Sequence, residues 1–493
     1  MSNNVILMDN RQLIPRWHTS RKAMSLQFPS LSVSPKKASD YQNDSFLDKA
    51  KRHWHEEKNY VNAIELHTSL TVRGVYSDVD GDDALRFLLT IEGQLPKGAR
   101  DLIAPQTKHI DKSKNYYTYS PSEVGKIISR LRSIVAKFPK DYMTWCDLGF
   151  YYTILGMTEK AERCMEISWN LCNGHPYIAR SYARFFVHND EPEKAMWVLK
   201  KSGGLNKDPL ITSASIAIGS AFDISGVDIS KARRLLDGYT GIRAFSSELA
   251  ASIGTLEYNN GKKKKAKDYF KSALIEPSEN VLSQYKWLCH KTGFSVNGDP
   301  NGNALTVEGN VHQLYVQGNF EDCRAKLLEL FSFQPISDGP ISDAGYMSLV
   351  GLNDPDFVIQ LSENRVPKTH MSFGELNNLT VAKLMKNDLE SAEVCMRLLA
   401  KKIDPEKPDS RGIYLATSGL VMFKLGDVDS GKDLYQKAIK YFESRKAYRA
   451  VALAEHYYSN CVKEIDPPLF ENLRKNVEKK AKDLGMKELS TDN

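Results

Sequence analysis

Arg180 and Arg184 are the side chains of this sequence best placed to recognise an anion. They lie four residues apart in a segment with helical spacing of apolar residues, so both side chains point the same way. Two guanidinium groups on one face could form paired hydrogen bonds with a carboxylate or a phosphate. The alternative is that each arginine pairs with an acidic residue of a neighbouring helix. The sequence leaves both interpretations open.

A second cluster with binding chemistry lies near the start of the chain. Residues 13–17 read Leu-Ile-Pro-Arg-Trp, an apolar and basic patch inside a polar stretch. Residues 1–44 are rich in Ser, Asn, Pro and Lys without sustained periodicity, which predicts a basic, mostly disordered arm. The patch is either a linear docking motif for a partner or a segment that packs back onto helices of the same chain. The candidate docking residues are Leu13, Ile14, Arg16 and Trp17.

The sequence contains no complete motif for metal binding or catalysis. The acidic run 78–83 would need Gly at its sixth position and Glu at its twelfth to bind calcium, but Asp83 and Leu89 stand there. The run therefore predicts a helix cap. His53 and His55 are two residues apart, so they do not share a helix face. With no zinc-protease, phosphate-loop, dinucleotide or nucleophile-elbow motif, we expect no metal, no cofactor and no catalytic site.

The densest basic run is Lys262–Lys265, which falls in a predicted turn between two helices. Solvated lysines are expected there, while contact with phosphate is the functional alternative. The run lacks the interleaved aromatic residues on which single-strand binders stack bases. A nucleic-acid-associated regulator using the arm and Lys262–Lys265 is nonetheless the second functional hypothesis, and steep salt sensitivity would distinguish it.

Composition indicates an ordinary folded protein. The 493 residues are 41% hydrophobic and 26% charged, and the formal charge of +6 is too mild to indicate nucleic-acid binding by itself. Seven scattered cysteines without a CxxC pair predict reduced thiols in an intracellular protein. No apolar run approaches the ~20 residues that span a bilayer, and no secretory signal is evident. We expect a cytoplasmic protein without a membrane partner.

The elements that must position these residues are predicted by a repeated spacing. Trp145, Leu148, Gly149 and Tyr152 precede a second helix in which Ala161 is the small residue facing them. The same small slot recurs at Ala195, Ala232 and Ala266, at intervals of 34, 37 and 34 residues, and again at Cys323, Ala392 and Gly431. The 69-residue gap before Ala392 fits two units, the first degraded around 341–368. Such hairpins cannot bury their apolar faces alone, so they must stack.

The predicted organisation is an all-α, right-handed solenoid of eight or nine hairpins. Its expected parts are the arm at 1–44, a helical cap region at 45–139, a first block at 140–296, a loop or joint at 297–303, a second block at 304–466, and a capping helix with a tail at 467–493.

The spacing W-x2-L-G-x2-Y, then L-G, then A, resembles the tetratricopeptide repeat (TPR), most closely in 142–173 and also in 249–278 and 412–444. This resemblance implies a concave groove, lined by first helices, that binds an extended peptide or a partner helix. The groove positions that it implies are Met143, Cys146, Phe150, Tyr177, Arg180, Arg184, Glu248, Ala251, Thr255, Asn377, Val381, Ala416, Leu420 and Phe423. The basic set by which chaperone-binding members clamp a terminal carboxylate is absent.

The sequence therefore predicts a non-catalytic interaction scaffold or adaptor in a multiprotein complex. Phe150, Tyr177, Leu420 and Phe423 are its expected apolar anchors, and Arg180 and Arg184 supply polar selection. A homo-oligomer remains open.

Overall fold

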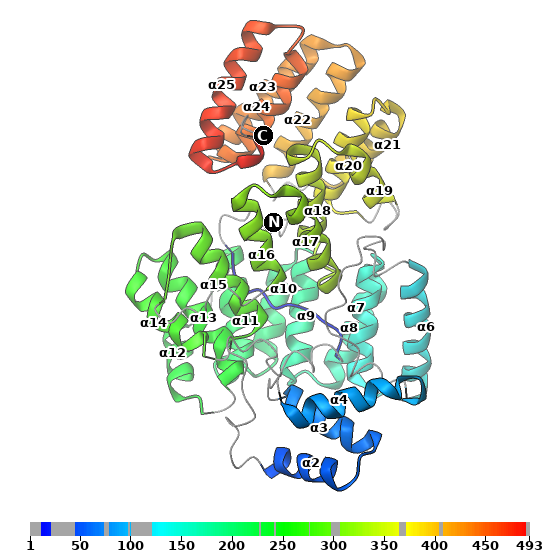
Figure 1. Cartoon of the computed structure of the whole chain (residues 1–493). Coiled ribbons are helices and arrows are strands. Elements are labelled where there is room, and N and C mark those ends of the chain that lie inside the picture. The colour runs from blue at the N-terminus through cyan, green and yellow to red at the C-terminus, as the bar shows by residue number, and fades with distance from the viewer. Residues whose placement is uncertain are drawn as a thin grey trace.

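The described part of the chain is a stack of helical hairpins, as the sequence predicts (Figure 1). The computed structural model describes residues 11–20, 45–72, 78–96, 99, 121–225, 228–240, 243–275, 277–296, 306–363, 371–403 and 408–489. Within these ranges all regular structure is helical. The predicted joint at 297–303 lies outside the described residues.

The helices before the first repeats are α2 (Ser45–Glu56), α3 (Tyr60–Val72), α4 (Val79–Thr90) and α6 (Pro121–Lys137). The following helices are α7 (Tyr142–Ile154), α8 (Thr158–Leu171), α9 (Pro176–His188), α10 (Pro192–Lys201), α11 (Pro209–Phe222), α12 (Ile229–Gly238), α13 (Arg243–Asn259), α14 (Lys263–Ala273) and α15 (Glu279–Thr292). The remaining helices are α16 (Val307–Gln317), α17 (Phe320–Phe333), α18 (Asp338–Tyr346), α19 (Pro355–Glu363), α20 (Phe373–Met385), α21 (Leu389–Lys401), α22 (Pro408–Leu425), α23 (Val428–Ser444), α24 (Tyr448–Val462) and α25 (Pro467–Leu484).

The small residues that defined the repeats lie in the second helix of each hairpin. Ala161, Ala195, Ala232, Ala266, Cys323, Ala392 and Gly431 fall in α8, α10, α12, α14, α17, α21 and α23, and all are buried. Glycines on the facing helices complete the close approach. A Cβ on Gly419 of α22 would lie 2.9 Å from Tyr435 Cδ2 and 3.2 Å from the Gly431 carbonyl oxygen. Small residues therefore set the spacing between paired helices.

The degraded repeat is a real hairpin with an irregular turn. It consists of α18 and α19, joined through a π-helical turn at Met347–Gly351. Three helices were not identified from the sequence: α3 was not expected, and α15 and α24 belong to none of the repeats recognised from spacing. The acidic run at 78–83 caps a helix as predicted, because the Asp78 side chain accepts a hydrogen bond from Gly81 N at the start of α4.

A turn after α25 returns to the middle of the chain. At Lys487–Leu489 the backbone forms a 3-10 turn that directs Glu488 inward, where its side chain is fully buried. The carboxylate accepts hydrogen bonds from Tyr346 Oη (2.8 Å) and Tyr315 Oη (3.0 Å), and Arg449 Nη2 donates to Tyr315 Oη at 2.6 Å. This C-terminal clasp links α16, α18 and α24.

The close helix spacing makes a directional prediction for glycine substitutions. A Cβ on buried Gly412 of α22 would lie 2.5 Å from Phe442 Cε1, in a ring that is itself buried. We expect Gly412→Ala to cost about 1–2 kcal/mol, because overpacking outweighs the gain in helix propensity.

The matched control is Gly125→Ala in α6, where a new Cβ meets no atom within 4 Å. That variant should be neutral or slightly stabilising through helix propensity. Thermal unfolding followed by circular dichroism measures both, and equal midpoints for the two variants would contradict the packing argument.

Candidate peptide-binding groove

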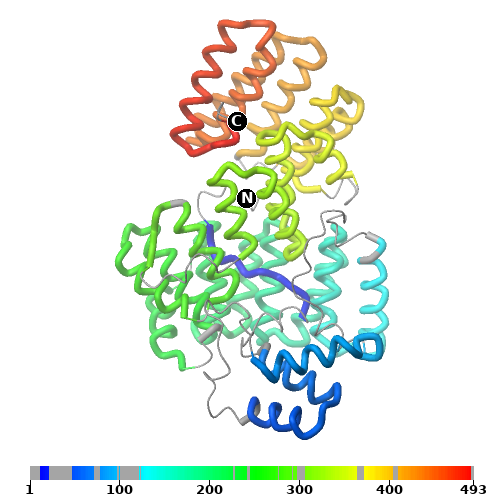
Figure 2. The backbone as a smooth tube through the Cα atoms, viewed as in Figure 1, coloured from blue at the N-terminus to red at the C-terminus, as the bar shows by residue number. Residues whose placement is uncertain are grey.

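Residues 11–20 run as an extended chain across helices of the first block (Figure 2). Leu13 is fully buried and Trp17 is 1% exposed. We call residues 11–20 the arm segment, and the surface of α7, α9, α13, α15 and the start of α16 that surrounds it the arm groove. Of the two interpretations offered for the patch around Trp17, the structure has the arm segment packed onto helices of the same chain.

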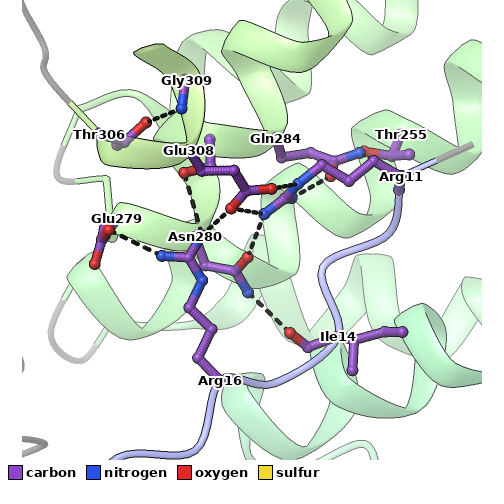
Figure 3. A network of polar contacts seen from close by, with 11 residues as sticks. Arg11, Ile14, Arg16, Thr255, Glu279, Asn280, Gln284, Thr306, Glu308 and Gly309 are labelled. Carbon is purple, nitrogen blue, oxygen red and sulfur yellow. Dashed lines mark hydrogen bonds and ion pairs between the residues drawn. The ribbon is translucent and has the colours of Figure 1, made fainter. Parts of the chain in front are cut away.

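The first part of the arm segment is held by a buried ion cluster (Figure 3). Arg11 binds Glu308 with both arms of its guanidinium, through Nε at 2.6 Å and Nη2 at 3.0 Å. The same side chain donates to Gln284 Oε1 (2.5 Å) and Asn280 Oδ1 (3.0 Å). Arg16 also pairs with Glu308, and its Nη1 lies 3.1 Å from Glu279 Oε1. One carboxylate thus joins two arginines that are five residues apart.

The start of α16 positions Glu308 for this role. Thr306 caps the helix by accepting a hydrogen bond from Gly309 N at 2.9 Å, so Glu308 lies in the first turn, where the helix dipole favours negative charge. Burial alone would raise the pKa of Glu308, but Arg11 and Arg16 together hold the pKa of this carboxyl well below its ordinary value. Burial likewise opposes the charge of Arg16, yet Glu279 and Glu308 raise the pKa of its guanidinium. Glu308 and Arg16 are therefore both charged at neutral pH.

Two apolar side chains anchor the arm segment between these polar contacts. Leu13 belongs to a buried cluster with Ala251 of α13 and Val281 and Leu288 of α15. The Trp17 ring packs edge-on against Phe150 of α7, with centroids 5.4 Å apart, and against Phe185 of α9 at 6.3 Å. Edge-to-face pairs of this kind add about 0.5–1.5 kcal/mol beyond the burial of area.

Side chains of the arm groove also contact the backbone of the arm segment. Gln284 Nε2 donates to the carbonyl of Arg11 (2.7 Å), and Asn280 Nδ2 donates to that of Ile14 (3.2 Å). Tyr177 Oη donates to the carbonyl of His18 at 2.7 Å. At the far end, Asp147 accepts from Ser20 N (2.7 Å) and Ser20 Oγ (2.6 Å). Because main-chain groups are the same in every peptide, the contacts with the three carbonyls and with Ser20 N can hold an extended chain whatever its side chains.

Of the six residues predicted as apolar anchors or for polar selection, four lie in this region. Phe150 and Tyr177 contact the arm segment directly, as described above. Arg180 pairs instead with Glu248 of α13, which was the alternative expected for it. Arg184 is buried, and burial lowers the pKa of its guanidinium to about 10 although Asp338 and Asp190 raise it. Recognition of a partner by Arg180 and Arg184 stays a prediction.

The two predicted anchors of the second block lie elsewhere. Leu420 is buried in a cluster formed by α19 to α25 and the π-helical turn at Met347–Gly351. The Phe423 ring lies 6.1 Å from the rings of Tyr435 and Tyr458. Both side chains therefore pack among neighbouring helices, and neither is brought near the arm groove. Their role as anchors for a partner stays a prediction.

Several residues of the arm groove were not identified from the sequence. Glu279, Asn280, Ser283 and Gln284 of α15 contact the arm segment, as does Glu308 of α16. No repeat was assigned to α15, so no groove position could be carried over to it. A detectable signal was present, because these four polar residues recur as adjacent pairs four positions apart on one face of the helix.

The other candidate sites show fewer binding features than the arm groove. Within the described ranges, no three His, Cys, Asp or Glu side chains are grouped so as to hold a metal ion. Lys262–Lys265 are all solvent-exposed, and Lys262 Nζ lies 3.7 Å from Glu257. Among the helices described, none combines the length and apolar character needed to cross a membrane.

Comparison with known proteins adds little to the site. No family model matches the chain, and no curated protein matches it. The chain is similar to the solved structure described as "Crystal structure of APC/C hetero-tetramer Cut9-Hcn1", with 12% identity and a TM-score of 0.24 over 72% of this chain and 75% of that one. It is also similar to "Human IFIT1 dimer with PPP-AAAA", with 14% identity and a TM-score of 0.30 over 83% and 98%. Such values transfer no residue role. The stacked hairpins give the described part of this chain the fold of an α-solenoid, and the spacing of their small residues resembles the tetratricopeptide repeat.

The ion cluster predicts a large cost for removing its shared carboxylate. Glu308→Ala would leave Arg11 and Arg16 buried without their main partner, so we expect the free energy of unfolding to fall by about 3 kcal/mol. The control, Glu393→Ala, removes an exposed carboxylate from α21 and should change stability by less than about 0.5 kcal/mol. Urea denaturation measures both, and similar small losses would show that the cluster contributes little.

Asp147 predicts a specific pH dependence. Burial raises the pKa of its carboxyl to about 6, although hydrogen bonds from Ser20 and Tyr177 lower it. A carboxyl with a raised folded-state pKa contributes stability that is fully present below its ordinary pKa of 3.8 and is lost as the pH rises through about 6. Between pH 5 and 7.5 this loss amounts to about 1 kcal/mol.

We expect Asp147→Asn to remove that part of the pH dependence, while the exposed control Asp237→Asn keeps it. Denaturant unfolding at pH 5 and pH 7.5 gives the comparison with the wild-type chain. Parallel profiles for wild type and Asp147→Asn would contradict the assignment of the titration to Asp147.

Proposed function

We propose that the protein is a non-catalytic interaction scaffold whose first block binds an extended segment of a partner protein. The observation that carries this proposal is a set of hydrogen bonds to the backbone of the arm segment: Gln284, Asn280 and Tyr177 donate to its carbonyls, and Asp147 accepts from Ser20 N. These side chains come from three different helices and act on peptide groups spread over ten residues. A surface built in this way has the properties of a peptide-binding groove.

The physical chemistry of the groove supports binding rather than catalysis. Glu308 and Glu279 are engaged by arginines, and Asp147 is engaged by Ser20. Burial raises the pKa of the Cys146 thiol, so that no thiolate forms near neutral pH. An adaptor function in a multiprotein complex and a cytoplasmic location follow as parts of the proposal. The exposed Lys262–Lys265 run provides the nucleic-acid alternative with a solvated patch only.

The test is affinity capture with the tagged full chain, with and without nuclease. The wild type and Arg11→Ala/Arg16→Ala serve as baits, because the second bait weakens the contacts that fill the groove. A further bait adds Asn280→Ala/Gln284→Ala, which removes two amides that contact a bound backbone. At about 1 kcal/mol per hydrogen bond, protein partners should bind roughly 30-fold more weakly to this bait than to Arg11→Ala/Arg16→Ala.

The matched control is Lys264→Glu/Lys265→Glu, which changes two exposed lysines outside the groove and should keep every protein partner. Partners that survive nuclease and depend on the two amides support the proposal. If partners are lost after nuclease treatment and from the lysine variant, and their binding weakens steeply as salt rises, the nucleic-acid alternative replaces the proposal. If Asn280→Ala/Gln284→Ala leaves the set of captured partners unchanged, groove binding is refuted.

A further inference from the structure

The arm segment has the features of a bound ligand more than those of a structural element. Its polar contacts join residues between 127 and 297 positions apart in the sequence, and α2, α3 and α4 intervene before the groove helices begin. It has neither helix nor strand over residues 11–19, and side chains of the groove supply the hydrogen bonds to its carbonyls at three positions. In Figure 2 it crosses the helices of the first block instead of continuing any hairpin.

We propose that the arm segment is an internal ligand that closes the groove, and that the partner segment which displaces it has the same chemistry. This rests on the proposed function and names the class of partner: an extended peptide with two arginines five residues apart, the second followed directly by a tryptophan. A leucine two positions after the first arginine completes the pattern.

The requirement for arginine follows from the acidic end of the groove. Glu308 is buried and accepts two parallel hydrogen bonds from Arg11 and another from Arg16, while Glu279 provides a second carboxylate for Arg16. Only a planar guanidinium can satisfy a carboxylate in this forked way, whereas a lysine offers a single point of contact. The distance between the two arginines is fixed because both bind the same carboxylate.

The apolar requirements follow from the two pockets. Leu13 fills a site between α13 and α15, and Trp17 fills a site between Phe150 and Phe185. The sites lie on opposite sides of the Arg16 contact along the path of the segment, so a ligand must present both side chains in one extended register. The backbone contacts at Arg11, Ile14, His18 and Ser20 then fix that register without adding sequence selectivity.

The buried charge of Glu308 makes direct replacement of the arm segment by a partner peptide easier than release of the arm segment from an empty groove. Leaving Glu308 buried without a cation would cost several kcal/mol, so an empty groove is disfavoured. A partner that brings its own guanidinium groups restores the ion cluster as the arm segment leaves. The tethered segment competes at an effective concentration on the order of millimolar, so a partner must offer a better match or a second contact elsewhere.

The direct test measures binding of a fluorescein-labelled peptide of residues 11–20 to the full chain by fluorescence anisotropy. The variant Arg11→Ala/Trp17→Ala, with its own segment disabled, should bind the peptide at least tenfold more tightly than the wild type. A peptide in which both arginines are replaced by lysine is the matched control and should bind at least tenfold more weakly. Equal affinity of wild type and variant, or no binding to a folded variant, would overturn the proposal.

A second measurement uses the wild type and does not depend on the folding of any variant. Hydrogen–deuterium exchange of the arm segment should become at least tenfold faster at 1 mM unlabelled peptide, and unchanged exchange would overturn displacement. A wild-type dimer that Arg11→Ala/Trp17→Ala abolishes would identify a second copy as the occupant and would also overturn it. The two proposals fail separately, because amide-dependent capture of partners without peptide exchange would leave the scaffold function standing and remove only the internal ligand.

Discussion

The groove depends on one buried carboxylate that cannot exist there alone. Glu308 lies in the first turn of α16, shielded from water, and two guanidinium groups from the arm segment neutralise it. Desolvating an ion costs several kcal/mol, and only complementary charge with good geometry repays it. The position of the arm segment is consequently coupled to the position of α16, and the apolar sites for Leu13 and Trp17 are filled in a single register.

The fold was largely predictable because its rules are local. Ala161, Ala195, Ala232 and Ala266 recur at nearly constant intervals, and each is buried where a second helix meets its partner. That spacing needs no knowledge of the rest of the chain. Where it was disturbed, as at the π-helical turn Met347–Gly351, the sequence indicated only a degraded unit.

The site was predictable only in part because its contacts are remote in sequence. Phe150 and Tyr177 were identified through the resemblance to a repeat family, and both contact the arm segment. Asn280, Gln284 and Glu308 were missed because α15 fits no repeat and because nothing local tells which distant segment a polar stripe will bind. Leu420 and Phe423 pack among helices of the second block, and their role as anchors for a partner stays a prediction, since a position on a helix face does not decide between a groove and a neighbouring helix.

The C-terminal clasp has a consequence for how the chain acquires its structure. Repeats in an open array contact only their neighbours, so folding can begin anywhere and ends can fray independently. Here α16 is held near its start by Arg11 and Arg16 and near its end by Tyr315, which binds Glu488. During synthesis, the central helix cannot complete its contacts until residue 488 has been made. Forming contacts between residues so far apart in sequence slows folding. Because these contacts join the middle of the array to both distant segments, the repeats unfold together rather than one at a time.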